Sequence, residues 1–307
     1  MILRRIWGLL LLGVLSGCSP GGPGSCKVDV VANLPLLPGR HLPTVEASLN
    51  ARKVALFIDT GAATSIVTPS AAREFELPAD AGNNRMMLTG IGGSVFVPVV
   101  TLRRLGLGNG TARNIDLPVA GELGPPVMGL PVIGLFGADF LANYDVDIDL
   151  PGHHFAIYTL EGCGSALQPV GSPYFEVPFR LEGTNIMVDL KLNDKPITAV
   201  LDSGASHTLL SHADAHRAGV TAGTMARDSA AHAIGIDLNP LETHIHRFGS
   251  LEIGAERMNN FPFVVGDTSD SLLGDDFLYF NRVWISYPLR KLFIQPSMQN
   301  PLVHMVP

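Results

Sequence analysis

Two short segments of the chain combine an aspartate, a hydroxyl residue and a glycine directly after an apolar run. The first is Asp59-Thr60-Gly61-Ala62 and the second is Asp202-Ser203-Gly204-Ala205. Burying an ionised carboxylate beside residues such as Phe57-Ile58 is unfavourable, so folding alone gives no reason for either acid. Two carboxyl groups brought together would share one proton. One could then act as general base on a water molecule while the other polarises a carbonyl, which is the chemistry of amide hydrolysis.

The residues beside each aspartate suit the same chemistry. Gly61 and Gly204 let the backbone approach the carboxyl groups closely and present unobstructed N–H groups to them. The hydroxyls of Thr60 and Ser203 could hydrogen-bond from one loop to the other and fix the spacing of the acids. We therefore predict Asp59 and Asp202 as the reacting pair, supported by Thr60, Gly61, Ala62, Ser203, Gly204 and Ala205.

The region around each aspartate occurs twice in the chain. The motifs are 143 residues apart (202 − 59), and the same offset places Leu49-Asn50 on Leu192-Asn193 and Gly90-Ile91-Gly92 on Ala233-Ile234-Gly235. Further on, residues 137–141 match residues 274–278 at an offset of 137 (274 − 137). Four blocks in the same order indicate an internal duplication.

Each copy contains the elements needed to end a buried strand at its aspartate. Glycine and proline make up 56 of 307 residues (33 + 23), which is typical of strands joined by turns. We expect an all-β fold of two homologous β-barrel lobes with short helices, related by a pseudo-twofold axis. The lobes are predicted over 40–160 and 174–296, with a linker at 161–173 and a tail at 297–307. The patterns predict strands at 44–49, 54–58, 146–148, 155–157, 186–192, 197–201, 283–285 and 292–294, and helices at 69–75 and 212–218.

With these elements in place, the sequence resembles an aspartic protease with retropepsin-like lobes fused in one chain. The paired motifs carry the resemblance, together with Gly90-Ile91-Gly92-Gly93 and the apolar residues before Gly137 and Gly274. Such enzymes cleave an extended polypeptide beneath a flap and need no metal or cofactor. The resemblance therefore implies endopeptidase activity, a polypeptide substrate, and an apolar pair that supports the strand of each aspartate. It also implies a first flap at Gly90, Ile91, Gly92 and Gly93 and a second at Ala233, Ile234 and Gly235.

The sequence departs from the family pattern at two places. Ala62 and Ala205 stand where pepsin-like enzymes have Ser or Thr, so a hydroxyl that would stabilise the ionised acids is missing and we expect a less acidic optimum. Ala63-Thr64 and Ser206-His207 replace residues that are often acidic in retroviral enzymes, so the subsites of those enzymes are not carried over.

Two further aspartates follow the glycines of the repeat. Asp139 and Asp276 lie at predicted helix starts, so we expect them to cap the helices or interact with their dipoles rather than to act as additional catalytic acids.

Two alternatives stay open at this point. The chain could be an inactive peptide-binding or scaffold protein that kept the fold, although binding alone would not require both acids. The halves could also pair between two chains, but the short linker favours pairing within one chain, and we expect a monomer.

Composition excludes several other classes of protein. The chain has 46% hydrophobic and 16% charged residues, enough for a sizeable core. Its net charge of −7 argues against nucleic acid as a partner, because binding to phosphates needs clustered Lys and Arg. Three cysteines are too few for a disulfide scaffold or a four-thiolate zinc site.

The N-terminus predicts export. A basic start, Met1-Ile2-Leu3-Arg4-Arg5, precedes an apolar run at 6–15 that suits a signal peptide and is too short to span a bilayer. Leu15-Ser16-Gly17-Cys18 resembles the bacterial lipobox, which implies a signal peptide at 1–17, a lipid on Cys18 and a tether over 18–39. The alternative is an ordinary signal with an incidental cysteine. We expect a membrane-anchored protein of the cell envelope facing the periplasm or exterior, and Ser19 favours the bacterial outer membrane.

Cys26 and Cys163 are the other two cysteines of the chain. In an oxidising compartment they could form a disulfide, or they could remain two separate thiols. Geometry decides between these, and the sequence alone provides none.

Overall fold

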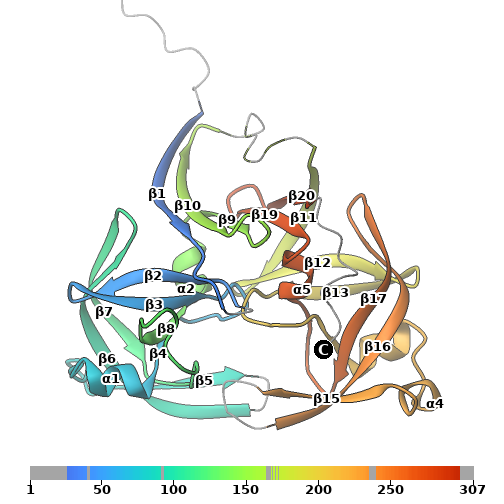
Figure 1. The fold of residues 1–307 in the computed structure, drawn as a ribbon, viewed down its shortest axis with the longest axis horizontal. Helices are drawn as coiled ribbons and strands as arrows, with labels where there is room; N and C mark the ends of the chain where they lie inside the picture. The colour runs from blue at the N-terminus through green and yellow to red at the C-terminus, as the bar shows by residue number, and fades with distance from the viewer. Residues whose placement is uncertain are drawn as a thin grey trace, which may run out of the picture.

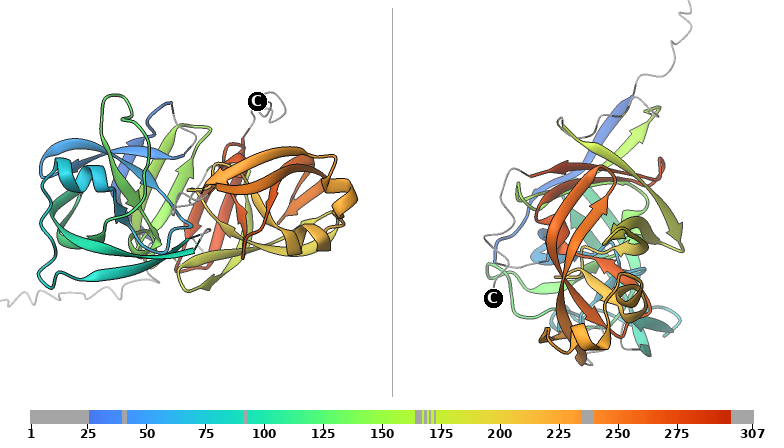
Figure 2. Two further views of the ribbon diagram at one scale, coloured as in Figure 1. Left: turned by 90° about the horizontal axis from the view of Figure 1, so that it is seen from below. Right: turned by 90° about the vertical axis from the view of Figure 1, so that its right-hand side faces the viewer.

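The computed structural model describes residues 26–39, 42–90, 93–163, 167, 169, 171, 173–234 and 240–297. In these ranges the chain forms twenty strands and five short helices, arranged as two lobes side by side (Figures 1 and 2). The expected all-β fold of two lobes is therefore confirmed. The predicted signal peptide, Cys18, Ile91, Gly92 and Gly235 lie outside the described residues. Within the described part, no helix has the length and apolar character to cross a membrane.

The first lobe is built on a seven-stranded sheet. Its elements are β2 (Thr44–Leu49), β3 (Arg52–Ile58), β4 (Ile66–Val67), α1 (Pro69–Glu74), β5 (Arg85–Gly90), β6 (Gly93–Leu107), β7 (Gly110–Pro118), β8 (Val132–Phe136) and α2 (Ala138–Leu141). The strand order is β4-β8-β3-β2-β6-β5, with β7 paired to β6. The apolar residues of β3 are buried up to Ile58, so the strand that leads to Asp59 lies in the interior of the sheet.

The second lobe repeats this plan. Its elements are β12 (Asn185–Leu192), β13 (Lys195–Leu201), β14 (Leu209–Ser211), α3 (His212–Arg217), α4 (Ala222–Met225), β15 (Ser229–Ile234), β16 (Pro240–Ile253), β17 (Glu256–Gly266), β18 (Ser271–Leu273) and α5 (Asp275–Leu278). Here β13 takes the place of β3 and leads to Asp202. It pairs in parallel with β18, as β3 pairs in parallel with β8.

A six-stranded segment of sheet joins the lobes. It consists, in order, of β1 (Lys27–Pro35), β10 (His154–Glu161), β9 (Asp145–Asp149), β19 (Asn281–Ser286), β20 (Lys291–Pro296) and β11 (Phe175–Glu182). At its centre β9 and β19 run antiparallel, and Asp147 pairs with Trp284, its own counterpart at the offset of 137 (284 − 147). A register that maps each copy onto the other fits a pseudo-twofold axis at this pair.

The N-terminal strand corrects the expected extent of the tether. Residues 27–35 fall within the tether predicted at 18–39, but they form β1 along β10, and Ala32 is buried in the core. The glycine, proline and serine residues before Cys26 are typical of a flexible tether, while the alternating pattern after Cys26 forms a strand. Cys26 forms a disulfide with Cys163, which decides between the two alternatives for these thiols and ties the start of β1 to the end of β10.

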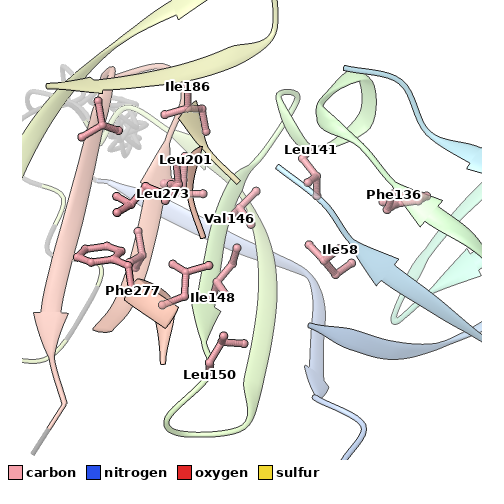
Figure 3. Packing of buried hydrophobic residues seen from close by; sticks show 14 of the residues in the cluster. Ile58, Phe136, Leu141, Val146, Ile148, Leu150, Ile186, Leu201, Leu273 and Phe277 are labelled. Carbon is pink, nitrogen blue, oxygen red and sulfur yellow. The ribbon is translucent and has the colours of Figure 1, made fainter. Parts of the chain in front are cut away.

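One hydrophobic core runs across both lobes and the joining sheet (Figure 3). Ile58 and Leu201, the residues just before the two aspartates, are fully buried in it. Val146 and Ile148 of β9 lie between the two groups of side chains in Figure 3. The strand ends that carry the acids are therefore packed into one continuous interior, which limits movement of one lobe against the other.

The two six-residue helices begin at capping residues. Thr68 caps α1 by accepting a hydrogen bond from the Ala71 N–H (3.1 Å), and Pro69 lies in the first turn, where its missing N–H costs nothing. In the second lobe Ser211 caps α3 in the same way, accepting from the Asp214 N–H (3.2 Å).

Candidate active site

The two aspartates lie at equivalent strand ends. The Asp59 N–H donates to the carbonyl of Phe136 (2.9 Å), and the Asp202 N–H donates to the carbonyl of Leu273 (3.0 Å). Phe136 and Leu273 close β8 and β18, the strands that pair in parallel with β3 and β13. The apolar residues before each glycine therefore support the strand of each aspartate, as the sequence implied.

Thr60 and Ser203 link the two motif loops to each other. The Thr60 N–H donates to Ser203 Oγ (3.1 Å), and the Ser203 N–H donates to Thr60 Oγ1 (3.0 Å). Each hydroxyl also donates across the interface, Thr60 to the carbonyl of Leu201 and Ser203 to that of Ile58 (both 2.8 Å). Both side chains are fully buried. Four reciprocal hydrogen bonds thus hold the loops together, as we expected from the hydroxyls.

The motif glycines bring the aspartates together. A Cβ atom on Gly61 would collide with the carboxyl group of Asp202, and a Cβ on Gly204 would collide with that of Asp59. Each glycine therefore lies directly against the acid of the opposite lobe. The two carboxyl groups therefore lie close enough to affect the pKa of each other. Both side chains remain partly exposed, so water can reach them.

Burial and mutual repulsion determine the protonation of this pair. Desolvation raises the pKa of Asp59 well above its ordinary value, and the charge of Asp202 raises it further. Desolvation also raises the pKa of Asp202. Hydrogen bonds from the Gly61 N–H (3.0 Å) and the Ala62 N–H (2.8 Å) to Asp59 oppose this effect, as does the Gly204 N–H (2.8 Å) on Asp202. The pair therefore holds one shared proton more readily than two separate acids would.

The aspartates near the helix starts have a different contact from the one predicted. In α2 and α5 no side chain caps the helix. Asp139 instead accepts hydrogen bonds from the Ser65 N–H (2.9 Å) and the Ser65 hydroxyl (2.7 Å). Asp276 does the same for the N–H (2.8 Å) and hydroxyl of Thr208. Of the two predicted roles, capping is not observed, while both acids do lie in the first turn of their helices, where an interaction with the helix dipole was expected. Each carboxyl group also bonds to a hydroxyl residue that lies across the loop, a partner that the helix pattern alone does not reveal.

Two hairpins extend from the lobes at the predicted flap positions. β5 pairs with β6 so that Met87 lies opposite Phe96 and Gly90 opposite Gly93. β15 pairs with β16, which makes the segment containing Ala233 and Ile234 a second hairpin. In the view of Figure 1, β5 and β15 extend from the two lobes toward the middle of the same edge of the molecule.

One acid near the pair was missed from the sequence. Asp275, the first residue of α5, is fully buried, while the equivalent residue of the first lobe is Ala138. The mismatch is visible in the aligned repeats, but nothing in the sequence showed that this carboxyl group is buried without a hydrogen-bond partner among the described residues. Among the described residues, no three His, Cys, Asp or Glu side chains form a cluster that could hold a metal ion.

The linked loops predict the effect of removing one hydroxyl. Thr60→Val leaves the buried Ser203 N–H and the Leu201 carbonyl without their partner, so we expect a loss of about 1–3 kcal/mol in the free energy of unfolding. Thr60→Ser keeps the hydroxyl, as the second lobe does with Ser203, and should remain close to wild type. Urea unfolding of the three proteins measures this, and equal stability of Thr60→Val and wild type would contradict the role of the hydroxyl.

Comparison with known families agrees with the duplicated plan. Residues 45–143 match the model of the gag-polyprotein aspartyl protease family, and residues 188–277 match that of an aspartyl protease family. Each match covers roughly a third of the chain and contains one of the two aspartates. No curated protein matches the sequence. Both lobes of the chain therefore carry aspartyl protease domains.

Proposed function

We propose that this protein is an aspartic endopeptidase that uses one dyad, Asp59 and Asp202, to hydrolyse peptide bonds in extended polypeptides. The observation that carries the proposal is the reciprocal contact of the motifs, in which each glycine lies against the opposite acid. Binding a peptide would not require two desolvated acids to be forced together. Water activation does require it, because one acid must accept a proton while the other donates one.

The shared proton gives the pair one neutral and one ionised carboxyl group, which divide the work. The ionised acid would take a proton from water as that water attacks the peptide carbonyl. The neutral acid would donate its proton to the carbonyl oxygen and stabilise the charge that develops there. When the C–N bond breaks, the proton taken from water would pass to the leaving amine, and the added hydroxyl would return a proton to the other acid as the carboxyl product forms.

The hairpins support an extended peptide as substrate. Leu88 pairs with Val95 and Met86 with Val97, so these side chains share one face of the first hairpin. Val97 and Leu88 pack on an apolar cluster that includes Ala120 and Val127, and Val95, nearer the tip, is exposed. This face continues an apolar surface toward the tip, where apolar substrate side chains could pack while the peptide backbone hydrogen-bonds to the hairpins.

The proposal includes a membrane tether at Cys18. A diacylated and N-acylated cysteine contributes roughly 0.8 kcal/mol for each buried CH₂ group, which is enough to hold a protein at a membrane surface. The lobes would then act at the envelope, on the periplasmic or outer side. The support for this part is the pattern of residues 1–18.

Replacing either acid tests the proposed activity. Asp59→Asn and Asp202→Asn each remove a group that must exchange a proton, so we expect kcat/KM to fall by about 10³-fold or more. The assay is cleavage of a diverse peptide library followed by mass spectrometry, with Asp116→Asn, an exposed acid of the first lobe, as the matched control. Cleavage retained by Asp59→Asn would overturn the proposal, and binding of peptides without cleavage by wild type would point to a scaffold.

The raised pKa values predict the pH dependence of cleavage. The active dyad holds one proton, and desolvation raises the pKa of both acids, so both limbs of the pH–rate profile move to higher pH. We expect an optimum above the range of roughly pH 2–3 that lies between the two apparent pKa values of the pepsin dyad. Ala62→Ser adds a hydroxyl beside Asp59 and should move the profile back toward lower pH. An optimum near pH 2–3 for the wild type would contradict the expectation.

Lipidation is tested separately from cleavage. In cells that express the Cys18→Ser variant, we expect the protein to incorporate no labelled fatty acid and to be absent from the membrane fraction. The reason is that the thiol that would carry the lipid is gone. Cys26→Ser removes the next cysteine along the chain and should keep both the label and the membrane association. Equal labelling of Cys18→Ser and wild type would show that the tether is wrong.

A further inference from the structure

The outer end of the joining sheet exposes an apolar surface. Val28 and Val30 of β1 are 43% and 46% exposed. Their partners on β10 are Leu160 and Tyr158. Because residues that pair across two strands share a face, these four side chains form one surface, which we call the ribbon patch. The other large exposed apolar side chains among the described residues are Met128 and four on the first hairpin, Met86, Met87, Val95 and Phe96.

The ribbon patch occupies one face of the two strands, and polar residues occupy the other. Lys27 and Asp29 alternate with the valines along β1. Their partners on β10 are Glu161 and Thr159, and all four of these polar residues are exposed. This end of the sheet is therefore amphipathic, although no other element packs on its two exposed valines. Contiguous apolar side chains of this kind indicate a surface that binds a partner.

Aromatic side chains continue the patch into the protein. The ring of Tyr158 stacks on that of Trp284 from β19, with 4.5 Å between the ring centroids. Trp284 belongs to a small buried cluster with Phe293, and Leu160 packs against this cluster. Tyr158 itself is only partly buried. A tyrosine that is partly exposed beside aliphatic side chains suits the boundary between water and lipid, because its ring is apolar and its hydroxyl is polar.

The disulfide places the patch where the predicted tether begins. Cys26 directly precedes β1 and is bonded to Cys163, two residues after the end of β10, so the outer ends of the two strands are held together. Only Gly, Pro and Ser occupy residues 19–25, between Cys26 and Cys18. The eight steps from residue 18 to residue 26 (26 − 18) reach at most about 28 Å. A folded unit of about 280 residues is roughly 50 Å across. A lipid on Cys18 therefore keeps the patch end nearer to the bilayer than the far end.

We propose that the ribbon patch lies on the membrane surface and orients the protein there, as a second contact beside the lipid on Cys18. The proposal rests on the proposed tether and not on the proposed cleavage. Acyl chains alone hold a protein at a bilayer but leave it free to rotate, whereas apolar side chains that enter the headgroup region turn one face toward the lipid. In Figure 1 the outer end of β1 lies at the edge opposite β5 and β15. Both hairpins therefore face away from the bilayer, toward polypeptides in the aqueous space.

A second copy of the chain is the other possible occupant of the patch, and β1 itself argues against it. This strand is the last of its sheet, so its outer edge has no neighbouring strand. The register shifts between Val30 and Ala32, and Lys27 and Asp29 place charges on the strand. Bulges and charges on an edge strand oppose the addition of another strand. The valines are therefore better suited to lipid than to a second β1.

A tryptophan on each face of the ribbon tests the orientation. Lipidated protein carrying Val28→Trp is bound to phosphatidylcholine vesicles with brominated acyl chains, because bromine quenches an indole at the acyl boundary. Thr159→Trp places the same indole on the polar face and is the matched control. The buried Trp284 gives the background in wild type. We expect quenching of Val28→Trp beyond this background and no additional quenching of Thr159→Trp.

A charge on the patch provides a second measurement. Adding Val30→Asp to Val28→Trp places a carboxylate on the face that meets the lipid, so most of the quenching should be lost while the acyl chains still hold the protein on the vesicles. Adding Thr159→Asp instead puts the same charge on the polar face and should leave the quenching in place.

The outcomes separate the patch from the tether. Equal quenching of Val28→Trp and Thr159→Trp in vesicle-bound protein would overturn the patch and leave the tether intact, and wild type without a lipid would overturn both. A wild type that sediments as a dimer, with Val30→Asp as a monomer, would assign the patch to a second copy. If Val30→Asp does not fold, the comparison of the two tryptophan variants still decides. Absence of peptide cleavage would end the proposed enzyme without affecting these results.

Discussion

The repulsion between two carboxyl groups held at one point is the constraint on which the rest of the structure depends. Two ionised acids about 4 Å apart repel by about 4 kcal/mol at the effective dielectric constant of a protein surface. A shared proton removes most of this repulsion, and four reciprocal hydrogen bonds of Thr60 and Ser203, each contributing about 1 kcal/mol, act against the remainder. Together these bonds exceed the repulsion that remains once the proton is shared.

The duplication explains how this balance is reached with few residues. Each motif supplies an acid to its own lobe and a glycine against the acid of the other lobe, so one tripeptide satisfies both requirements. The frame behind the motifs is common to both lobes, because β9 and β19 pair in a register that maps each copy onto the other. An ion pair between the buried Asp147 and the half-buried Arg282 lies in the same sheet (2.6 and 3.0 Å). The spacing of the acids is therefore set by the joining sheet and the core as well as by the loops.

The sequence predicted what repetition and strand pattern encode, and it missed what depends on contacts between distant segments. The strands that lead to Asp59 and Asp202, the start of α1 at residue 69 and the two hairpins follow from local patterns and from the offset between the copies. The strand at 27–35 was missed because its partner, β10, lies more than a hundred residues away. The same reason applies to the Cys26–Cys163 disulfide and to the bond between Asp139 and Ser65. Pairing across the fold cannot be seen in a local pattern.

The departures from symmetry are as informative as the symmetry itself. A dyad in two identical halves has two equivalent acids, and the proton is held equally by both. In this chain the surroundings differ, because the buried Asp275 bonds through its N–H to the second motif where Ala138 bonds to the first. A dimer of two identical halves could not carry this acid once, since it would appear in both halves. Fusion of the halves into one chain removes this restriction, because each lobe can then change without its counterpart.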